Sequence, residues 1–169
     1  CENYIHDLWH NRLDEKAMRR IGLPWSKELM ARTFTAPLGT LQTARLALKH
    51  GIACHLAGGT HHAHTDFGSG YCMVNDLAFT SETLIKSGEV TNVLIFDLDV
   101  HQGDGTAAML AHQPYAYTCS IHCEKNFPFR KSASYLDIGL APNVADSEYL
   151  GVVDDTLSYL LNTLNPDLV

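Results

Sequence analysis

The sequence has few basic residues, no C-x-x-C pair of cysteines and no long apolar run. Its 169 residues contain 12 Lys and Arg against 19 Asp and Glu, which gives a net charge of −7. Because a nucleic-acid backbone is bound by clustered Lys and Arg, the scattered basic residues argue against a direct nucleic-acid partner. There is no apolar run of 18 residues and no signal peptide, so we expect no membrane partner and a cytoplasmic protein.

The cysteines do not suggest disulfides. They are odd in number, and several stand in apolar runs, where a cysteine behaves as a small buried hydrophobe. The five positions are Cys1, Cys54, Cys72, Cys119 and Cys123. Unpaired thiols persist in a reducing compartment, which again favours the cytoplasm.

Length and composition predict one globular domain. Hydrophobic residues make up 46% of the chain and charged residues 18%, with no disordered signature. The chain begins at Cys1 without a methionine, and residues 165–169 read as a turn that opens a new strand. We therefore expect residues 1–169 to be a fragment of one domain that lacks its start and its C-terminal part.

Hydrophobic periodicity predicts an α/β protein. The expected helices are 2–20, a short one at 27–32, 37–51 with Pro37 at its first position, 75–87, 106–110, and 146–161 capped by Asp146 and Ser147. The expected strands are 52–57, a central strand from Val93, 115–121, and one that begins at Asp167; residues 127–143 are expected to be irregular. Alternating strands and helices indicate a parallel sheet with helices on both faces and active groups at the carboxyl ends of its strands.

The stretch VLIFDLDVHQGDG, residues 93–105, organises the rest of the chain. Its apolar half is typical of a buried strand, and its polar half places Asp97, Asp99 and His101 at a spacing of two. In an extended chain such residues point to the same side. Two neighbouring carboxylates repel each other unless a cation lies between them, so this spacing predicts a metal site.

A loop rich in glycine and histidine, residues 58–70, follows the expected first strand and reaches the same edge of the sheet. Its flanking glycines allow His61 and His62 to be aimed at one point. A histidine needs a partner on its second nitrogen to fix its tautomer, and Asp97 and Asp104 are available for that role. The cluster favours chemistry over a purely structural role.

Three motifs occur in order: GGTHHA at 58–63, GSGYCMVND at 68–76 and DLDVHQGDG at 97–105. Together they resemble the histone deacetylase family, which includes bacterial acetylpolyamine amidohydrolases and acetoin-utilisation proteins. The resemblance continues through 120–122 and, more loosely, through 126–129 and 136–138. Gln102 makes the chain similar to the bacterial members and the smallest eukaryotic class. The implied fold is the parallel α/β fold that arginases and deacetylases share, here incomplete.

The resemblance implies a zinc-dependent amidohydrolase that removes an acetyl group from a lysine side chain or a polyamine. Asp99 and His101 match two of the three zinc ligands, although iron in place of zinc stays open. His61, paired with Asp97, and His62, paired with Asp104, match the groups that move protons between a zinc-bound water and the leaving amine.

Two further sets of residues follow from the resemblance alone. Gly70 and Tyr71 match the lining of the narrow tube that grips the acyl-bearing chain. A potassium ion near the zinc is implied as well. The matching positions for it are Asp97, Asp99, His101, Ser120 and Ile121.

The family's third zinc ligand and its oxyanion-stabilising tyrosine have no counterpart in residues 1–169. We interpret this as truncation and expect these residues alone to be inactive. The alternative is a catalytically silent module that keeps the fold for binding or regulation. Arginase-like chemistry with two manganese ions is disfavoured by Gln102 and by the histidine pair. Homo-oligomer formation is left open.

Overall fold

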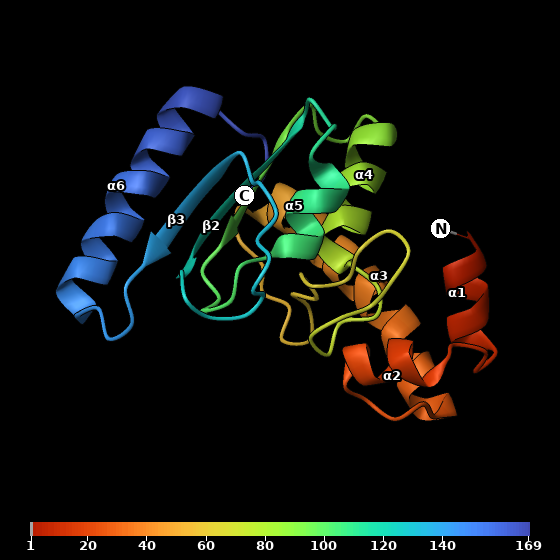
Figure 1. Ribbon diagram of the computed structural model, residues 1–169. Coiled ribbons are helices and arrows are strands. Elements are labelled where there is room, and N and C mark those ends of the chain that lie inside the picture. The colour runs from red at the N-terminus through yellow and green to blue at the C-terminus, as the bar shows by residue number, and fades with distance from the viewer. Residues whose placement is uncertain (1) are drawn as a thin grey trace.

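The computed structural model describes residues 2–169 and contains one parallel sheet with helices on both faces (Figure 1). The strands are β1 (Val93–Asp97), β2 (Ala116–Cys123) and β3 (Leu136–Leu140), in the spatial order β1-β2-β3. The predicted α/β class and the parallel sheet are confirmed. The central strand forms where the apolar run VLIF predicted it, and Asp97 is its last residue.

Two hydrophobic clusters hold the helices to the sheet, because successive strand residues point to opposite faces. Val93 and Ile95 face the cluster formed with α3 (Lys27–His50), α4 (Asp76–Lys86) and α5 (Asp104–Leu110). Leu94 faces the opposite cluster, where Leu160 of α6 (Asp146–Leu164) is fully buried. Strand β1 is therefore covered by helices on both sides, and its polar carboxyl end is fixed between them.

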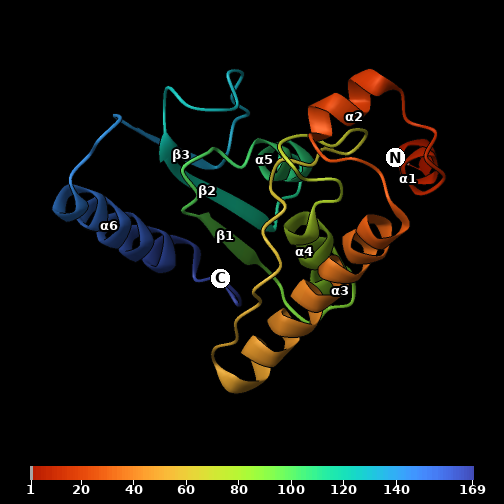
Figure 2. The same ribbon diagram turned by 90° about the horizontal axis from the view of Figure 1, so that it is seen from below.

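The N-terminal region forms a separate small cluster against α3 (Figures 1 and 2). Residues 2–20 were expected to be one helix, but they form α1 (Glu2–Trp9) and α2 (Glu15–Ile21). The break has a local cause: Asp14 accepts a hydrogen bond from the amide of Ala17 and so starts a new helix. Leu8 and Ile21 of these helices are buried in a cluster with Met30 of α3.

The two helices expected around Pro37 are one helix. Helix α3 starts at Lys27, after the cap Ser26, and continues through Pro37 to His50. The proline was expected at the first helical position because it lacks an amide hydrogen. It is instead buried in the helix interior, where tertiary packing outweighs the loss of one backbone hydrogen bond.

Residues 52–57 do not form the strand that was expected there. Ile52 is 85% exposed and Leu56 is 96% exposed, so this apolar run has no sheet neighbour and no core to enter. Conversely, β3 lies in the segment expected to be irregular. Its residues alternate between half-buried and exposed, and this weaker pattern was hidden by the prolines on either side.

The final helix is longer than expected and starts differently. It ends at Leu164, and Ala145 occupies the capping position without a side-chain hydrogen bond, so Asp146 and Ser147 are not the cap. After it, Leu168 forms a parallel bridge with Val93 and accepts a hydrogen bond from the amide of Leu94 at 2.9 Å. Of the strand expected from Asp167, the structure shows this single bridge on the outer edge of β1. Within residues 2–169, no helix combines the length and apolar character that a membrane crossing requires.

Candidate active site

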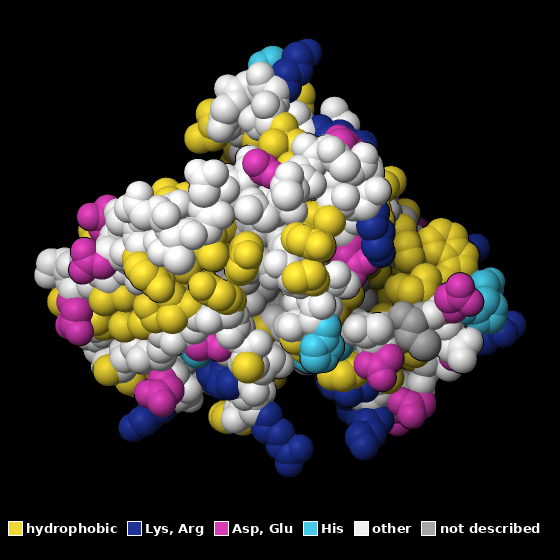
Figure 3. All heavy atoms as spheres, turned by 90° about the horizontal axis from the view of Figure 1, so that it is seen from above, with side chains coloured by type: hydrophobic (Ala, Val, Ile, Leu, Met, Phe, Trp, Pro, Cys, Tyr) yellow, Lys and Arg dark blue, Asp and Glu magenta, His cyan; other side chains and the backbone are white. Residues whose placement is uncertain are grey.

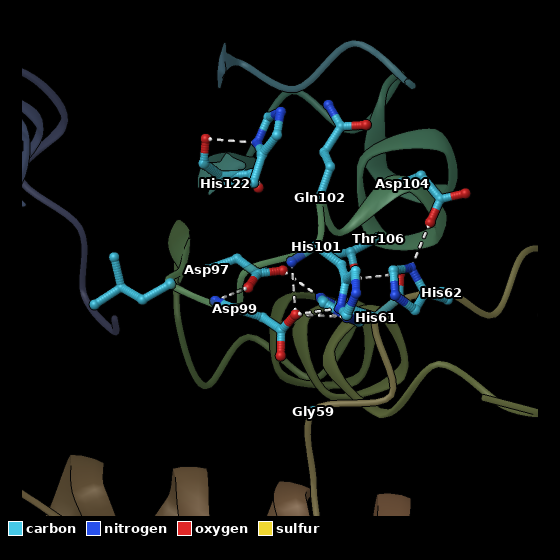
Figure 4. Close-up of polar contacts among 12 residues, drawn as sticks. Gly59, His61, His62, Asp97, Asp99, His101, Gln102, Asp104, Thr106 and His122 are labelled. Atoms are coloured by element: carbon cyan, nitrogen blue, oxygen red, sulfur yellow. Dashed lines mark hydrogen bonds and ion pairs between the residues drawn. The ribbon is translucent and has the colours of Figure 1, made fainter. Parts of the chain in front are cut away.

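The predicted polar residues come together beyond the carboxyl end of β1 (Figure 4). The loop with His61 and His62 lies against the turn that carries Asp99 and His101, and Asp104 opens α5 beside them. The loop is held in place because the amide of Thr106 donates to the carbonyl of His61 at 3.0 Å. Two segments that are distant in the sequence, the loop with the histidine pair and residues 97–104, therefore form one site.

His61 is paired with Asp97. Its Nδ1 donates to Oδ2 of Asp97 at 2.6 Å, and the His61 residue is only 7% exposed. Burial lowers the pKa of His61, but the hydrogen bond and the charge of Asp97 outweigh burial, so the net pKa lies above the usual value. The carboxylate therefore fixes the ring and favours its protonated form.

His62 is paired with Asp104 in the same way. Its Nδ1 donates to Oδ1 of Asp104 at 2.7 Å, and His64 donates from Nε2 to the other oxygen at 2.9 Å. Burial raises the pKa of Asp104, but the hydrogen bonds from His62 and His64 outweigh it and lower that pKa to about 2. The rings of His61 and His62 lie with centroids 4.0 Å apart. Both carboxylate partners predicted from the sequence are present.

Asp99 and His101 reach the site by a different route from the one predicted. Strand β1 ends at Asp97, so the alternation of an extended chain does not apply to residues 99 and 101. The chain bends instead, because the amide of Asp99 donates to Oδ1 of Asp97 and the amide of His101 donates to Oδ1 of Asp99. The residues converge as predicted, but through two side-chain-to-backbone turns.

The donor set of Asp99 and His101 fits part of a zinc site. Oδ1 of Asp99 and Nδ1 of His101 lie 3.0 Å apart, and their side chains are 50% and 36% exposed. Two tetrahedral zinc ligands would lie about 3.3 Å apart, and carboxylate oxygen and imidazole nitrogen are both zinc ligands. No cluster of three or more His, Cys, Asp or Glu side chains suited to a metal occurs within residues 2–169.

Three of the residues matched to potassium, Asp97, Ser120 and Ile121, lie on neighbouring strands, and Asp99 and His101 lie in the turn that follows β1. Asp97 and Ser120 are direct partners in the register of β1 and β2, and Ile121 follows Ser120. Ser120 and Ile121 are buried, and the hydroxyl of Ser120 lies 3.0 Å from Nδ1 of His122. Hydroxyl, carbonyl and carboxylate oxygens suit a hard cation, so the chemistry of this set fits the expectation.

Gly70 and Tyr71 occupy different surroundings. A Cβ on Gly70 would lie 2.6 Å from Cδ2 of His62, so Gly70 is in direct contact with the site. Tyr71 is 70% exposed, and its ring lies over Gly22, next to a hollow that it lines together with Leu23 and other residues. The structure therefore brings only Gly70 of this pair against the histidines.

Phe127 is a site residue that the sequence reasoning did not single out. Its ring meets those of His62 and His101 edge to face, with centroids 4.9 and 6.0 Å apart. A Cβ on Gly70 would also lie 3.1 Å from the ring of Phe127. The only sequence signal for it was the loose family match at 126–129.

Gln102 anchors the loop that carries Phe127. The Gln102 side chain is buried, donates to the carbonyl of Ser132 and to Asp137 at 2.7 Å each, and accepts from the amide of Ser132. It thereby ties the loop that carries Phe127 to the turn that carries His101. The sequence marked Gln102 only as a distinguishing residue of subfamilies.

Comparisons with known proteins identify the family. Residues 1–169 match the family model of the histone deacetylase domain. An uncharacterised protein of Picosynechococcus sp. is 49% identical over 167 residues, which is 99% of this chain and 56% of that protein. The acetoin utilization protein AcuC of Staphylococcus aureus (strain MSSA476) is 31% identical over 95% of this chain and 46% of its own length.

Solved structures of HDAC homologs have a similar fold. The crystal structure of an HDAC homolog from Aquifex aeolicus matches with a TM-score of 0.82 at 25% identity, over 98% of this chain and 50% of that one. An HDAC homolog complexed with SAHA matches with a TM-score of 0.80 at 25% identity, over 96% of this chain and 50% of that one. The chain spans about half the length of the relatives it matches.

Proposed function

Because this chain belongs to the histone deacetylase family, we propose that its site takes part in hydrolysing an acetylated amine with zinc as the cofactor. The observation that carries the proposal is the two buried imidazole–carboxylate pairs, His61 with Asp97 and His62 with Asp104, whose rings lie side by side. Amide hydrolysis needs a base for the attacking water and an acid for the leaving amine. Two paired histidines in contact meet both needs.

The carboxylates determine which nitrogen of each ring is available. Asp97 and Asp104 each accept a hydrogen bond from Nδ1, so Nε2 is left to accept or deliver a proton. The upward shift of the pKa of His61 favours holding a proton once it has been accepted. One histidine would take the proton of the water and the other would protonate the amine.

Asp99 and His101 would hold the zinc ion, with a third ligand from outside these 169 residues. When bound, zinc lowers the pKa of its water and polarises the acetyl carbonyl. Potassium, held by Asp97, Asp99, His101, Ser120 and Ile121, is part of the same proposal, supported by the adjacency of Asp97 and Ser120 on β1 and β2.

The substrate is proposed to be an acetylated lysine side chain or an acetylated polyamine. The ring of Phe127, which meets that of His62 edge to face, offers an apolar wall for a methylene chain, and Gly70 brings its backbone close to His62. Tyr71 stays in the proposal as a substrate-binding residue, although its ring lies over Gly22 and not beside the histidines. A cytoplasmic location is also proposed, supported by the unpaired thiols of Cys54, Cys72, Cys119 and Cys123.

The test is to assay the protein at its natural length, with metal analysis, against an acetyl-lysine peptide and an acetylpolyamine in parallel. We expect release of acetate from at least one substrate, loss of activity on chelation, and recovery on adding zinc. Bound zinc without hydrolysis of either substrate would favour the catalytically silent module instead.

A further inference from the structure

A fully buried carboxylate lies directly behind the histidine loop. Asp76, the first residue of α4, is 0% exposed. Its Oδ1 accepts from the amide of Thr60 at 2.7 Å and lies 2.7 Å from the Thr60 hydroxyl. Its Oδ2 accepts from the amide of Gly59 at 2.9 Å and from the hydroxyl of Thr40 at 2.6 Å. Two successive backbone amides of the loop thus donate hydrogen bonds to one carboxylate.

This arrangement keeps Asp76 charged despite its burial. A buried carboxylate is costly unless its oxygens are fully hydrogen-bonded, and a helix N-terminus adds favourable electrostatics. Burial raises the pKa of Asp76, but the hydrogen bonds from Thr40 and Thr60 outweigh it and leave the pKa below its usual value. The approach is also close: a Cβ on Gly58 would lie 2.7 Å from Oδ2 of Asp76.

Thr40 extends this network to a histidine outside the site. The Thr40 hydroxyl has one proton, and a carboxylate can only accept, so that proton goes to Asp76. Nδ1 of His55, 2.9 Å from the Thr40 oxygen, must therefore be the donor to Thr40. A chain of hydrogen bonds therefore runs from His55 through Thr40 and Asp76 to the loop. It links α3 and α4 to the backbone that precedes the histidine pair.

The loop is clamped on both sides of that pair. Asp76 holds the amides of Gly59 and Thr60, immediately before His61 and His62. The side-chain amide of Asn75 donates to the carbonyl of Ala63 at 3.0 Å, immediately after them. Figure 4 shows Gly59 in the loop that leads to the two histidines. Removing one clamp lets the rings shift relative to their partners. A displacement of about 1 Å is enough to lower a catalytic rate by about 100-fold.

We propose that Asp76, supported by Thr40 and His55, is a positioning residue that sets the placement of the His61 and His62 rings for hydrolysis. The proposal rests on the proposed function. It assigns Asp76 no contact with the substrate. It predicts that charge and hydrogen bonding at residue 76, and not only the stability of the fold, determine turnover.

The test compares Thr40→Val, Thr40→Ser and Asp76→Asn in the protein at its natural length. Thr40→Val keeps the side-chain shape but removes the donor to Asp76, so kcat should fall about 10- to 100-fold with KM within about twofold. Thr40→Ser restores the hydroxyl and should restore kcat. Asp76→Asn faces the loop amides with an NH₂ group and should lower kcat at least as much.

The matched control for Thr40→Val is Thr80→Val, which makes the same substitution on α4, the helix that carries Asp76. Thr80 is buried and its hydroxyl has no hydrogen-bond partner, so this variant should keep the wild-type kcat. A second readout is the set of imidazole NMR signals of His61 and His62, which should shift in Thr40→Val and return in Thr40→Ser.

Two outcomes would overturn the proposal: wild-type kcat in Thr40→Val and Asp76→Asn, or imidazole signals that stay unchanged in both. If the wild-type protein hydrolyses neither substrate, the proposed function fails, and the imidazole signals alone decide whether Asp76 positions the rings. A lower melting temperature with unchanged kcat and unchanged signals would assign the network to stability and contradict the proposal.

Discussion

The polar residues of the site differ sharply in burial. His62 is 4% exposed and Asp104 is 7% exposed, whereas half of the Asp99 side chain is exposed. A buried pair keeps its hydrogen bond and excludes water, which suits a group that must hold and release a proton. An open carboxylate beside an open imidazole is free to bind an ion. The two sets should therefore respond differently to substitution.

Substitution of the ligand pair should empty the zinc site, and substitution of the histidine pair should not. In the protein at its natural length, Asp99→Ala and His101→Ala should lose zinc and nearly all activity. His61→Ala and His62→Ala should keep zinc and lose about 10²- to 10⁴-fold in rate, the usual contribution of a general acid or base. Metal analysis together with acetate release measures both. Stoichiometric zinc in Asp99→Ala and His101→Ala would contradict the ligand assignment.

Asp104 should make the fold sensitive to acid. Its pKa is about 2 in the folded protein against 3.8 for an ordinary aspartate, because the hydrogen bonds from His62 and His64 outweigh burial. The carboxylate therefore stabilises the fold fully above about pH 4, and this contribution is lost as the pH falls through about 2. Urea unfolding at pH 7 and at pH 3 should show a smaller acid-induced loss of free energy in Asp104→Asn than in the wild type.

The control for the acid experiment is Asp154→Asn, which changes an exposed aspartate on α6. It should show the same acid-induced loss as the wild type. An Asp104→Asn protein with the full wild-type pH dependence would mean that Asp104 gains nothing from its histidine partners.

At the scale of elements, glycines decide how closely the loops approach the site. Gly70 has φ of +51°, a conformation that is strained for other residues, and His62 leaves no room for a Cβ there. Gly103 is restricted by space alone, because a Cβ added there would clash with Oδ2 of Asp97. Gly151, in the interior of α6, has nothing within 4 Å of its added Cβ.

Two glycine-to-alanine substitutions should consequently have opposite effects. Gly70→Ala should destabilise the fold by about 1–2 kcal/mol and lower the rate, because strain and the clash displace His62. Gly151→Ala should stabilise by about 0.5–1 kcal/mol, because alanine favours a helix interior. Urea unfolding measures both. A neutral Gly70→Ala would show that the loop has more freedom than its contacts indicate.

At the scale of the whole molecule, hydrophobic side chains are distributed unevenly over the surface. Hydrophobic side chains gather in a band on the side where α6 lies (Figure 3), and Leu150, Tyr159 and Leu161 of that helix are exposed. The outer edge of β1 has only the short bridge at Leu168 as its neighbour within residues 2–169. Exposed apolar surface and a free strand edge favour association with further protein.

A polypeptide of residues 1–169 alone should bind zinc weakly and show no turnover. The proposed site has two zinc ligands within these residues, Asp99 and His101, whereas a catalytic zinc site has three protein ligands. Isothermal titration of zinc into this polypeptide and into the protein at its natural length should show much tighter binding in the latter. Equally tight binding in both would mean that the third ligand lies within these 169 residues.

The sequence alone determined the parallel α/β class, the central strand and the pairing of His61 with Asp97 and of His62 with Asp104. These features rest on local signals: an apolar, β-branched run that is typical of a buried strand, and motifs whose order and spacing resemble those of a known family. Of the strand predicted from Asp167, the structure shows a single bridge between Leu168 and Val93. Prediction from the sequence failed where a local pattern competed with packing, as at Pro37 inside α3 and at the exposed residues 52–57.

Only the tertiary structure decided how the site is assembled. Asp99 and His101 converge through turns after β1 has ended, Phe127 meets the histidines because Gln102 holds its loop, and Asp76 anchors the loop from behind. Each of these contacts joins side chains to segments whose positions depend on the packing of other elements. Periodicity and spacing describe neighbours along the chain, so contacts between distant segments become visible only once the sheet and its helices have brought them together.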